Sequence, residues 1–151
     1  MELTNENALQ FILAGKAQFT VTNISTQNRY TYKVNRCDTN NNLYFVSVLY
    51  NYKSTNKEYS DEQQFKYIGT IRKDTNTEQI QFIYGNKSIL KQDSIQVKGF
   101  TYIIKHLITK DLPDVYFITH TGKCGRCGRR LTDEKSILTG LGSECRKIIG
   151  L

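Results

Sequence analysis

Three cysteines near the end of the chain have the spacing of a metal site. Cys124 and Cys127 form a C-x2-C step, and Cys145 follows eighteen residues later. Two thiolates at that spacing can bind one Zn²⁺ from a tight turn, in which Gly125 and Gly128 can take positive φ angles at no steric cost. The sequence therefore predicts a zinc knuckle in this segment.

The other two ligands are expected from the ends of neighbouring elements. Ser143 is a good helix N-cap, which places Cys145 in the first helical turn, where the helix dipole favours a negatively charged sulfur. His120 is the expected fourth ligand because it ends a predicted strand just before Cys124. Together with Cys124 and Cys127, these residues would form a closed site of three cysteines and one histidine, which is the pattern of structural zinc.

Several alternatives stay open for this site. If His120 is not a ligand, Asp133, Glu144 or a water molecule would complete the site. The thiols can also be free. A redox role is weaker, because a thioredoxin-type C-x-x-C needs a long apolar helix at its second cysteine, and Gly128 with two arginines follows instead.

Two residues that can ligate metals lie apart from this segment. Cys37 is expected to be a buried or inert thiol. His106 falls within a predicted helix and is expected to be exposed or helix-flanking.

Positive charge is concentrated around the cysteines. The formal net charge is +7, and residues 120–151 contribute +4 of it, with seven lysines and arginines against three acids. Such an excess is expected of a surface that approaches phosphates, although solvated charge without a partner is the alternative. The expected nucleic-acid contacts are Arg126, Arg129, Arg130, Arg146 and Lys147.

The hydrophobic pattern predicts an α+β fold, with a mainly antiparallel sheet and two flanking helices. Helices are expected at 4–14 and 95–108, and strands at 17–24, 29–34, 43–50, 65–72, 79–84 and 115–118. We expect an α+β domain at 1–119 and a small zinc-knuckle module at 120–151 packed on it. The strand at 43–50 is apolar nearly throughout and is therefore predicted to be central. The polar stretch at 51–62 is predicted to be a surface loop.

Tyrosines lie near lysines and arginines along several of these strands or their connecting loops. That combination can stack bases and follow phosphates on single-stranded nucleic acid, and it is equally typical of an ordinary half-buried sheet. The tyrosines are Tyr30, Tyr32, Tyr44, Tyr50, Tyr52, Tyr59 and Tyr67.

The composition points to a soluble cytoplasmic protein. Four cysteines, three of them in metal spacing, suit a reducing compartment. The sequence shows no signal peptide, and no apolar run approaches the roughly 20 residues that span a bilayer, so no membrane partner is expected.

The chain resembles a family of small, mostly uncharacterised proteins encoded by bacteriophages and prophages. The specific motif is H-T-G-K-C-G-R-C-G-R-R-L-T at 120–132, followed by S-I at 136–137 and G-L-G-S-E-C at 140–145. Weaker strand motifs lie at 11–21, 29–34, 44–49 and 67–71. The resemblance implies a C-terminal zinc-binding domain of unknown function, whose ligands match His120, Cys124, Cys127 and Cys145. It implies the cytoplasm of a host bacterium and supplies no activity.

Two functions follow as hypotheses. The first is a non-enzymatic accessory protein that binds DNA or RNA through its basic C-terminal module, with zinc fixing the fold. The second is an anti-defence inhibitor that binds a host defence protein or host enzyme, with purely structural zinc. Catalysis is not expected, because a filled site leaves no open metal position and no catalytic set of side chains stands out.

Overall fold

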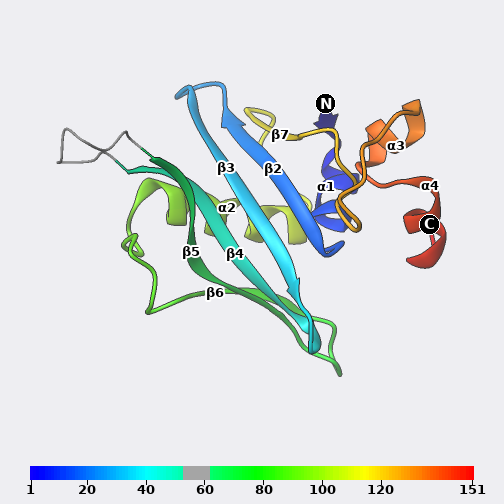
Figure 1. The fold of residues 1–151 in the computed structure, drawn as a ribbon. Coiled ribbons are helices and arrows are strands. Elements are labelled where there is room, and N and C mark those ends of the chain that lie inside the picture. Colours follow the sequence, from blue (N-terminus) through cyan, green and yellow to red (C-terminus); the bar gives the residue numbers. More distant parts are fainter. Residues whose placement is uncertain (53–61) are drawn as a thin grey trace.

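The computed structural model describes residues 1–52 and 62–151 and has one seven-stranded antiparallel sheet (Figure 1). The strands lie in the order β1 (Glu2–Leu3), β7 (Tyr116–His120), β2 (Lys16–Asn23), β3 (Asn28–Cys37), β4 (Asn40–Tyr52), β5 (Glu62–Lys73) and β6 (Ile80–Tyr84). The helices are α1 (Asn5–Ile12), α2 (Ile95–Ile108), α3 (Glu134–Thr139) and α4 (Ser143–Ile148). The predicted α+β class is confirmed. Most of the predicted 51–62 loop, Tyr59 included, lies outside the described residues.

Alternation of apolar and polar side chains buries one face of the strands. In β4, Tyr44, Val46 and Val48 are buried, whereas Phe45 between them is 43% exposed. The prediction of a central strand here is therefore right only in part. β4 lies inside the sheet between β3 and β5, but one of its faces is not covered.

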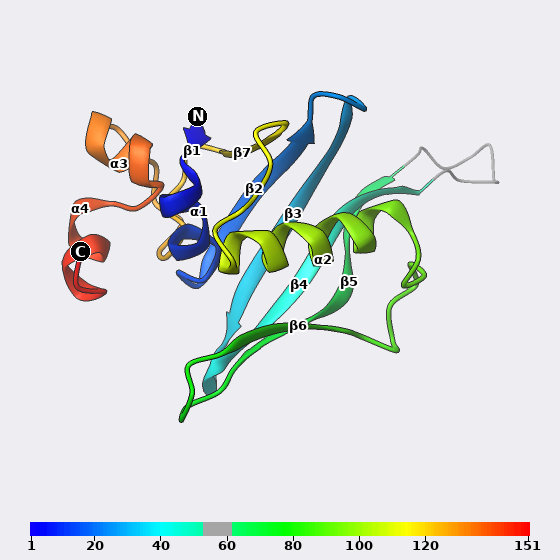
Figure 2. The same ribbon diagram turned by 180° about the vertical axis from the view of Figure 1, so that it is seen from behind.

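Both α1 and α2 pack on the same face of the sheet, as Figure 2 shows. Ser94 caps α2 by accepting a hydrogen bond from the N–H of Val97 at 3.4 Å. The buried Phe100 ring of α2 lies 5.0 Å from the Tyr32 ring and 4.9 Å from the Phe82 ring, measured between centroids. These contacts join the helix to β3 and β6 and form the centre of the core. No helix of the described residues is long and apolar enough to cross a membrane.

The last strand in the sequence, β7, is inserted between β1 and β2. Its register pairs Thr119 with Glu2 on one side and His120 with Phe19 on the other. The chain consequently leaves the sheet beside α1, and residues 121–151, with α3 and α4, lie at that end of the molecule (Figures 1 and 2). The division into parts 1–119 and 120–151 stays a prediction.

Phe11 of α1 joins this C-terminal module to the sheet. Its ring is buried against the backbone of two glycines: a Cβ added to Gly125 would lie 2.6 Å from ring atoms, and one added to Gly140 would lie closer still. The N–H of Lys16 donates to the Gly125 carbonyl at 2.6 Å, and the N–H of Gly125 donates to the Gly140 carbonyl at 2.9 Å. The module is therefore fixed to the sheet through backbone that only glycine allows.

We expect Gly140→Ala to destabilise the fold more than Gly128→Ala. Both glycines have positive φ, +74° and +79°, but an added Cβ meets Phe11 only at Gly140 and meets nothing within 4 Å at Gly128. Gly128→Ala should lower the free energy of unfolding by about 1 kcal/mol from backbone strain alone. Gly140→Ala should cost about 1–3 kcal/mol more, because the Phe11 ring must move. Urea denaturation measures both, and equal losses would contradict this packing.

Candidate metal centre

Cys124, Cys127 and Cys145 converge in the structure. Their sulfur atoms all lie within 4.8 Å of one another, and no disulfide links them. Cys124 and Cys145 are buried, whereas Cys127 is exposed. Within residues 1–52 and 62–151, these three form the one group of metal-ligating side chains close enough to hold an ion.

A tight hairpin, the knuckle at residues 122–131, carries the first two cysteines. The N–H of Cys124 donates to the Arg129 carbonyl at 2.7 Å, and the N–H of Gly128 donates to the Cys124 carbonyl at 2.9 Å. The predicted positive φ is found at Gly128 but not at Gly125. A residue without a side chain is needed at Gly125 for another reason: its backbone lies against the Phe11 ring of α1.

The third cysteine lies in the first turn of α4. The N-cap, however, is Gly142 and not Ser143, which is already the first helical residue. The N–H of Gly142 donates to Sγ of Cys124 at 3.4 Å. The start of α4 is therefore tied to the knuckle through a sulfur atom, and no side chain caps it.

Backbone N–H groups favour a thiolate at Cys124. Its Sγ accepts hydrogen bonds from the N–H groups of Arg126 and Gly142, both at 3.4 Å. Burial disfavours the thiolate, but the backbone donors of Gly142, Cys127 and Arg126 outweigh burial and lower the pKa of Cys124 to about 7. This is the sulfur best prepared to bind a cation.

The opposite holds at Cys145. Burial raises the pKa of its thiol, and the neighbouring Cys124 and Cys127 sulfurs raise it further, against the effect of Arg126. The Nη1 atom of Arg126 lies 3.6 Å from Sγ of Cys145. Three sulfurs this close cannot all ionise without a positive charge among them, because like charges oppose ionisation. A bound metal cation would supply that charge.

The donor set fits a thiophilic metal. Sulfurs bound to one tetrahedral Zn²⁺ at about 2.3 Å are separated by roughly 3.8 Å, so small side-chain rotations suffice to close the present cluster around an ion. Soft thiolates select zinc, copper(I) or iron–sulfur centres over calcium and magnesium. The structure thus supports a metal ion at the three cysteines without specifying which metal.

His120 does not join the three sulfurs. Its ring is buried, and both nitrogens are engaged by backbone groups: Nδ1 accepts the N–H of Gly122 at 2.9 Å, and Nε2 lies 2.6 Å from the Ile137 carbonyl. Burial lowers the pKa of His120 and favours the neutral ring with its proton on Nε2. In this structure His120 ties β7 to α3, and of the four predicted ligands the structure brings together the three cysteines.

Two carboxylates predicted as alternative ligands line the same hollow as the sulfurs, which has a volume of about 180 Å³. Asp133 caps α3, with its oxygens bonded to the N–H of Ser136 at 3.0 Å and to its hydroxyl at 2.7 Å. Glu144 is exposed and makes no hydrogen bond or ion pair with the other residues that the structure describes. Glu144 is therefore the carboxylate that can turn toward the cysteines without giving up a cap.

The predicted phosphate contacts differ in where they point. Arg129, Arg130 and Lys147 are exposed, and Arg126 is partly buried beside a sulfur. Arg146 is only 8% exposed, and its Nη1 donates to the Leu141 carbonyl at 2.6 Å and the Ser136 hydroxyl at 3.0 Å. Arg146 holds α4 against α3 and is not part of the proposed binding surface.

The remaining metal-ligating candidates lie elsewhere. Cys37 is half-buried, and its Sγ lies 3.5 Å from the Thr39 hydroxyl. His106 lies at the end of α2, where Nδ1 is 2.7 Å from a carboxylate oxygen of Asp111. Neither belongs to the cysteine cluster.

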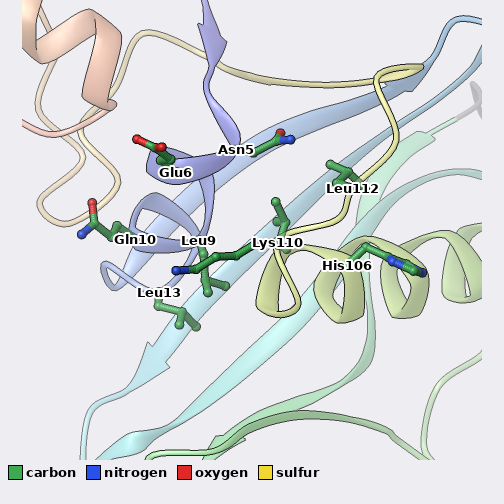
Figure 3. Close-up of a pocket in the computed structure, with 9 residues that line it drawn as sticks. Asn5, Glu6, Leu9, Gln10, Leu13, His106, Lys110 and Leu112 are labelled. Atoms are coloured by element: carbon green, nitrogen blue, oxygen red, sulfur yellow. The ribbon is translucent and has the colours of Figure 1, made fainter.

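A hollow of about 620 Å³ lies between α1 and the end of α2 (Figure 3). Leu9 and Leu13 line it, and the Lys110 side chain reaches across it toward α1, whereas the His106 ring points away. Its lining brings together no set of nucleophiles or ligands, so the chemistry of the chain stays with the three cysteines.

One family model matches the chain. It is described as a family of unknown function (DUF6011), and it matches residues 116–150. That range starts at β7 and runs through all three cysteines to the end of α4, so the chain is similar to this family over its C-terminal module. No curated protein and no solved structure gives a significant match.

We expect the purified protein to bind one equivalent of Zn²⁺ or Co²⁺, and Cys124→Ser to weaken that binding by more than about 100-fold. Loss of a residue that hydrogen-bonds to a metal ligand already lowers metal affinity by about 10–100-fold, and Cys124→Ser removes the ligand itself. Metal analysis and the thiolate-to-cobalt absorption measure this. Cys37→Ser is the control and should bind as the wild type does. Equal metal content in both variants would exclude the cluster as the site.

His120→Ala should leave the metal content at one equivalent and should lower the free energy of unfolding. Removing the ring leaves the Ile137 carbonyl and the Gly122 N–H without partners and opens a cavity, at a cost of about 2–4 kcal/mol. His106→Ala, at the partly exposed second histidine, should cost less than about 1 kcal/mol. Metal loss in His120→Ala, measured at a urea concentration where it is folded, would restore this histidine as a ligand.

Proposed function

We propose that this chain is a non-enzymatic, zinc-stabilised accessory protein of phage type that binds nucleic acid. Cys124, Cys127 and Cys145 hold one structural Zn²⁺, and Glu144 or a water molecule takes the fourth position. The ion fixes the knuckle and α4 in one arrangement and compensates the charge of the sulfurs. The resemblance to small phage and prophage proteins supports the accessory role in a host cytoplasm.

The observation that carries the proposal is the unpaired positive charge of the module. Arg129 and Arg130 are exposed at the end of the knuckle, and Lys123, Lys135 and Lys147 are exposed around it. Within residues 1–52 and 62–151 the ion pair found is His106 with Asp111, at the C-terminal end of α2. These exposed cations therefore form no ion pair with a carboxylate of the described residues.

Arginine at the knuckle suits phosphate recognition. The planar guanidinium can donate two parallel hydrogen bonds to one phosphate, and a rigid hairpin presents it at little entropic cost. Contacts of this kind fix a protein on the nucleic-acid backbone without reading its sequence. We therefore propose general phosphate binding by the module.

We expect Arg129→Ala with Arg130→Ala to weaken duplex DNA binding and to flatten its salt dependence. Each phosphate contact contributes about 0.9 to the slope of log affinity against log salt, so two lost contacts should reduce the slope by about two. Fluorescence anisotropy over a salt series measures this. The matched control is Lys98→Ala with Lys105→Ala, which removes two exposed charges from α2 and should change little.

Absence of measurable affinity for DNA and RNA at low salt would end this proposal. Co-purification from host lysate after nuclease treatment then tests the inhibitor hypothesis. A host protein that stays bound after nuclease treatment, without nucleic-acid affinity of the chain, would favour inhibition over nucleic-acid binding.

A further inference from the structure

One face of the sheet is not covered. Both large helices lie on the opposite face, and in Figures 1 and 2 no helix lies over the side that Figure 1 presents. On the helix face Tyr32 and Tyr44 are buried, so these two predicted base-stacking tyrosines belong to the core. The uncovered side, which we call the open face, carries different aromatic residues.

Three large apolar side chains are exposed side by side on the open face. Phe45 of β4, Tyr67 of β5 and Ile83 of β6 are 43%, 37% and 40% exposed. The register places Phe45 and Ile83 on either side of Thr70, and Tyr67 opposite Ser47, two residues along from Phe45. The two rings and the isoleucine therefore form one patch across three adjacent strands.

The Tyr67 ring packs directly against the backbone of a neighbouring segment. A Cβ added to Gly85 would lie 2.5 Å from the ring, so the tyrosine lies directly against glycine backbone. The register shift in β4–β5 pairing between Val46 and Ser47 leaves Ile68 buried and turns Tyr67 to the open face. The ring is thus supported from below while more than a third of the residue stays exposed.

The same face is positively charged. Lys33 of β3 lies beside the patch, with Nζ 4.0 Å from the centre of the Phe65 ring. A hollow of about 500 Å³ next to it is lined by Lys16, Lys33 and Phe45, and also by Asp38 of the turn between β3 and β4. Of the β2–β6 side chains that the structure describes, none is acidic. The Phe45 ring and the side chains of Lys16 and Lys33 therefore line the same hollow.

These features select among occupants of the open face. A second copy of this chain would bring the same positive charge and be repelled, and a neutral apolar protein surface would leave the lysines desolvated without partners. A nucleic-acid duplex has phosphates for the lysines but keeps its base faces stacked inside. Single-stranded nucleic acid offers both phosphates and free base faces.

We propose that the open face binds single-stranded nucleic acid, with bases stacked on Phe45 and Tyr67 and phosphates bound by Lys33 and Lys16. The inference adds a second surface to the proposed function and does not require that the knuckle arginines bind. Sequence reasoning pointed to tyrosines near basic residues but missed Phe45, which strand alternation relative to buried Val46 identifies.

The test compares a labelled single-stranded 12-mer with a duplex of the same length by fluorescence anisotropy. Phe45→Leu with Tyr67→Leu keeps apolar bulk and removes the rings, and it should weaken single-strand binding by about tenfold or more while duplex binding stays unchanged. Tyr102→Leu is the matched control: Tyr102 is also 37% exposed, but it lies on α2, and its loss should not alter binding.

A second measurement does not depend on variants. Photocrosslinking of a single strand that carries 5-iodouracil to the wild-type protein should label peptides that contain Phe45 or Tyr67. Crosslinks confined to residues 120–151, or unchanged single-strand affinity in the leucine variant, would overturn the open-face inference.

The two proposals fail separately. If the ring variant binds normally and only the Arg129 and Arg130 variant is weakened, the open face is refuted and the module stands. If the arginine variant binds normally and the ring variant loses single-strand binding, the module is refuted and the open face stands.

Discussion

The C-terminal module depends on holding three sulfur atoms together in a segment that buries few apolar side chains of its own. Leu131 and Leu141 are its buried leucines, and a core of that size cannot order thirty residues alone. Two other supports add to it: the Phe11 ring of α1, packed on glycine backbone from outside the module, and the module's own N–H groups that donate to Cys124. Sulfurs brought this close oppose one another's ionisation, and a bound metal ion would remove that repulsion and stabilise the module.

Much of this architecture could be read from residue patterns. Period-two alternation located the strands, the three- and four-residue apolar spacing located α2, and cysteine spacing located the sulfur cluster. These features succeed because they depend on local geometry: which face a side chain occupies, and how far a turn can separate two ligands. The short β1 and the insertion of β7 between β1 and β2 carry no such local signal, whereas α3 has an Asp133 N-cap and a Gly140 C-cap that could have located it.

Two of the predicted site residues, His120 and Arg146, are polar groups that the structure engages with protein atoms of neighbouring elements. His120 ends a strand before the knuckle, as a ligand would, yet its ring is satisfied by a carbonyl of α3. Arg146 has the charge of a phosphate contact, but it lies buried and donates to backbone and hydroxyl oxygens. Buried polar groups take whichever partners the tertiary fold supplies, and those partners cannot be read from spacing. With His120 so placed, the structure brings three cysteine ligands together, and the fourth ligand stays a prediction.

Lys16 connects the two surfaces that we propose for nucleic acid. Its backbone N–H is bonded to Gly125 of the knuckle, and the same residue lines the hollow beside Phe45 on the open face. A single strand that leaves the patch past Lys16 would therefore reach the module next. The proposed stacking surface and the proposed phosphate-binding hairpin are thus joined at one end of β2.

X-ray absorption spectroscopy of the zinc-loaded wild-type protein tests the central claim most directly. Three bound cysteines predict three sulfur neighbours at about 2.3 Å and one light atom, without the outer-shell scattering of an imidazole ring. Two or fewer sulfur neighbours, or clear imidazole scattering, would contradict the account. The first would break up the cluster, and the second would return His120 to the metal.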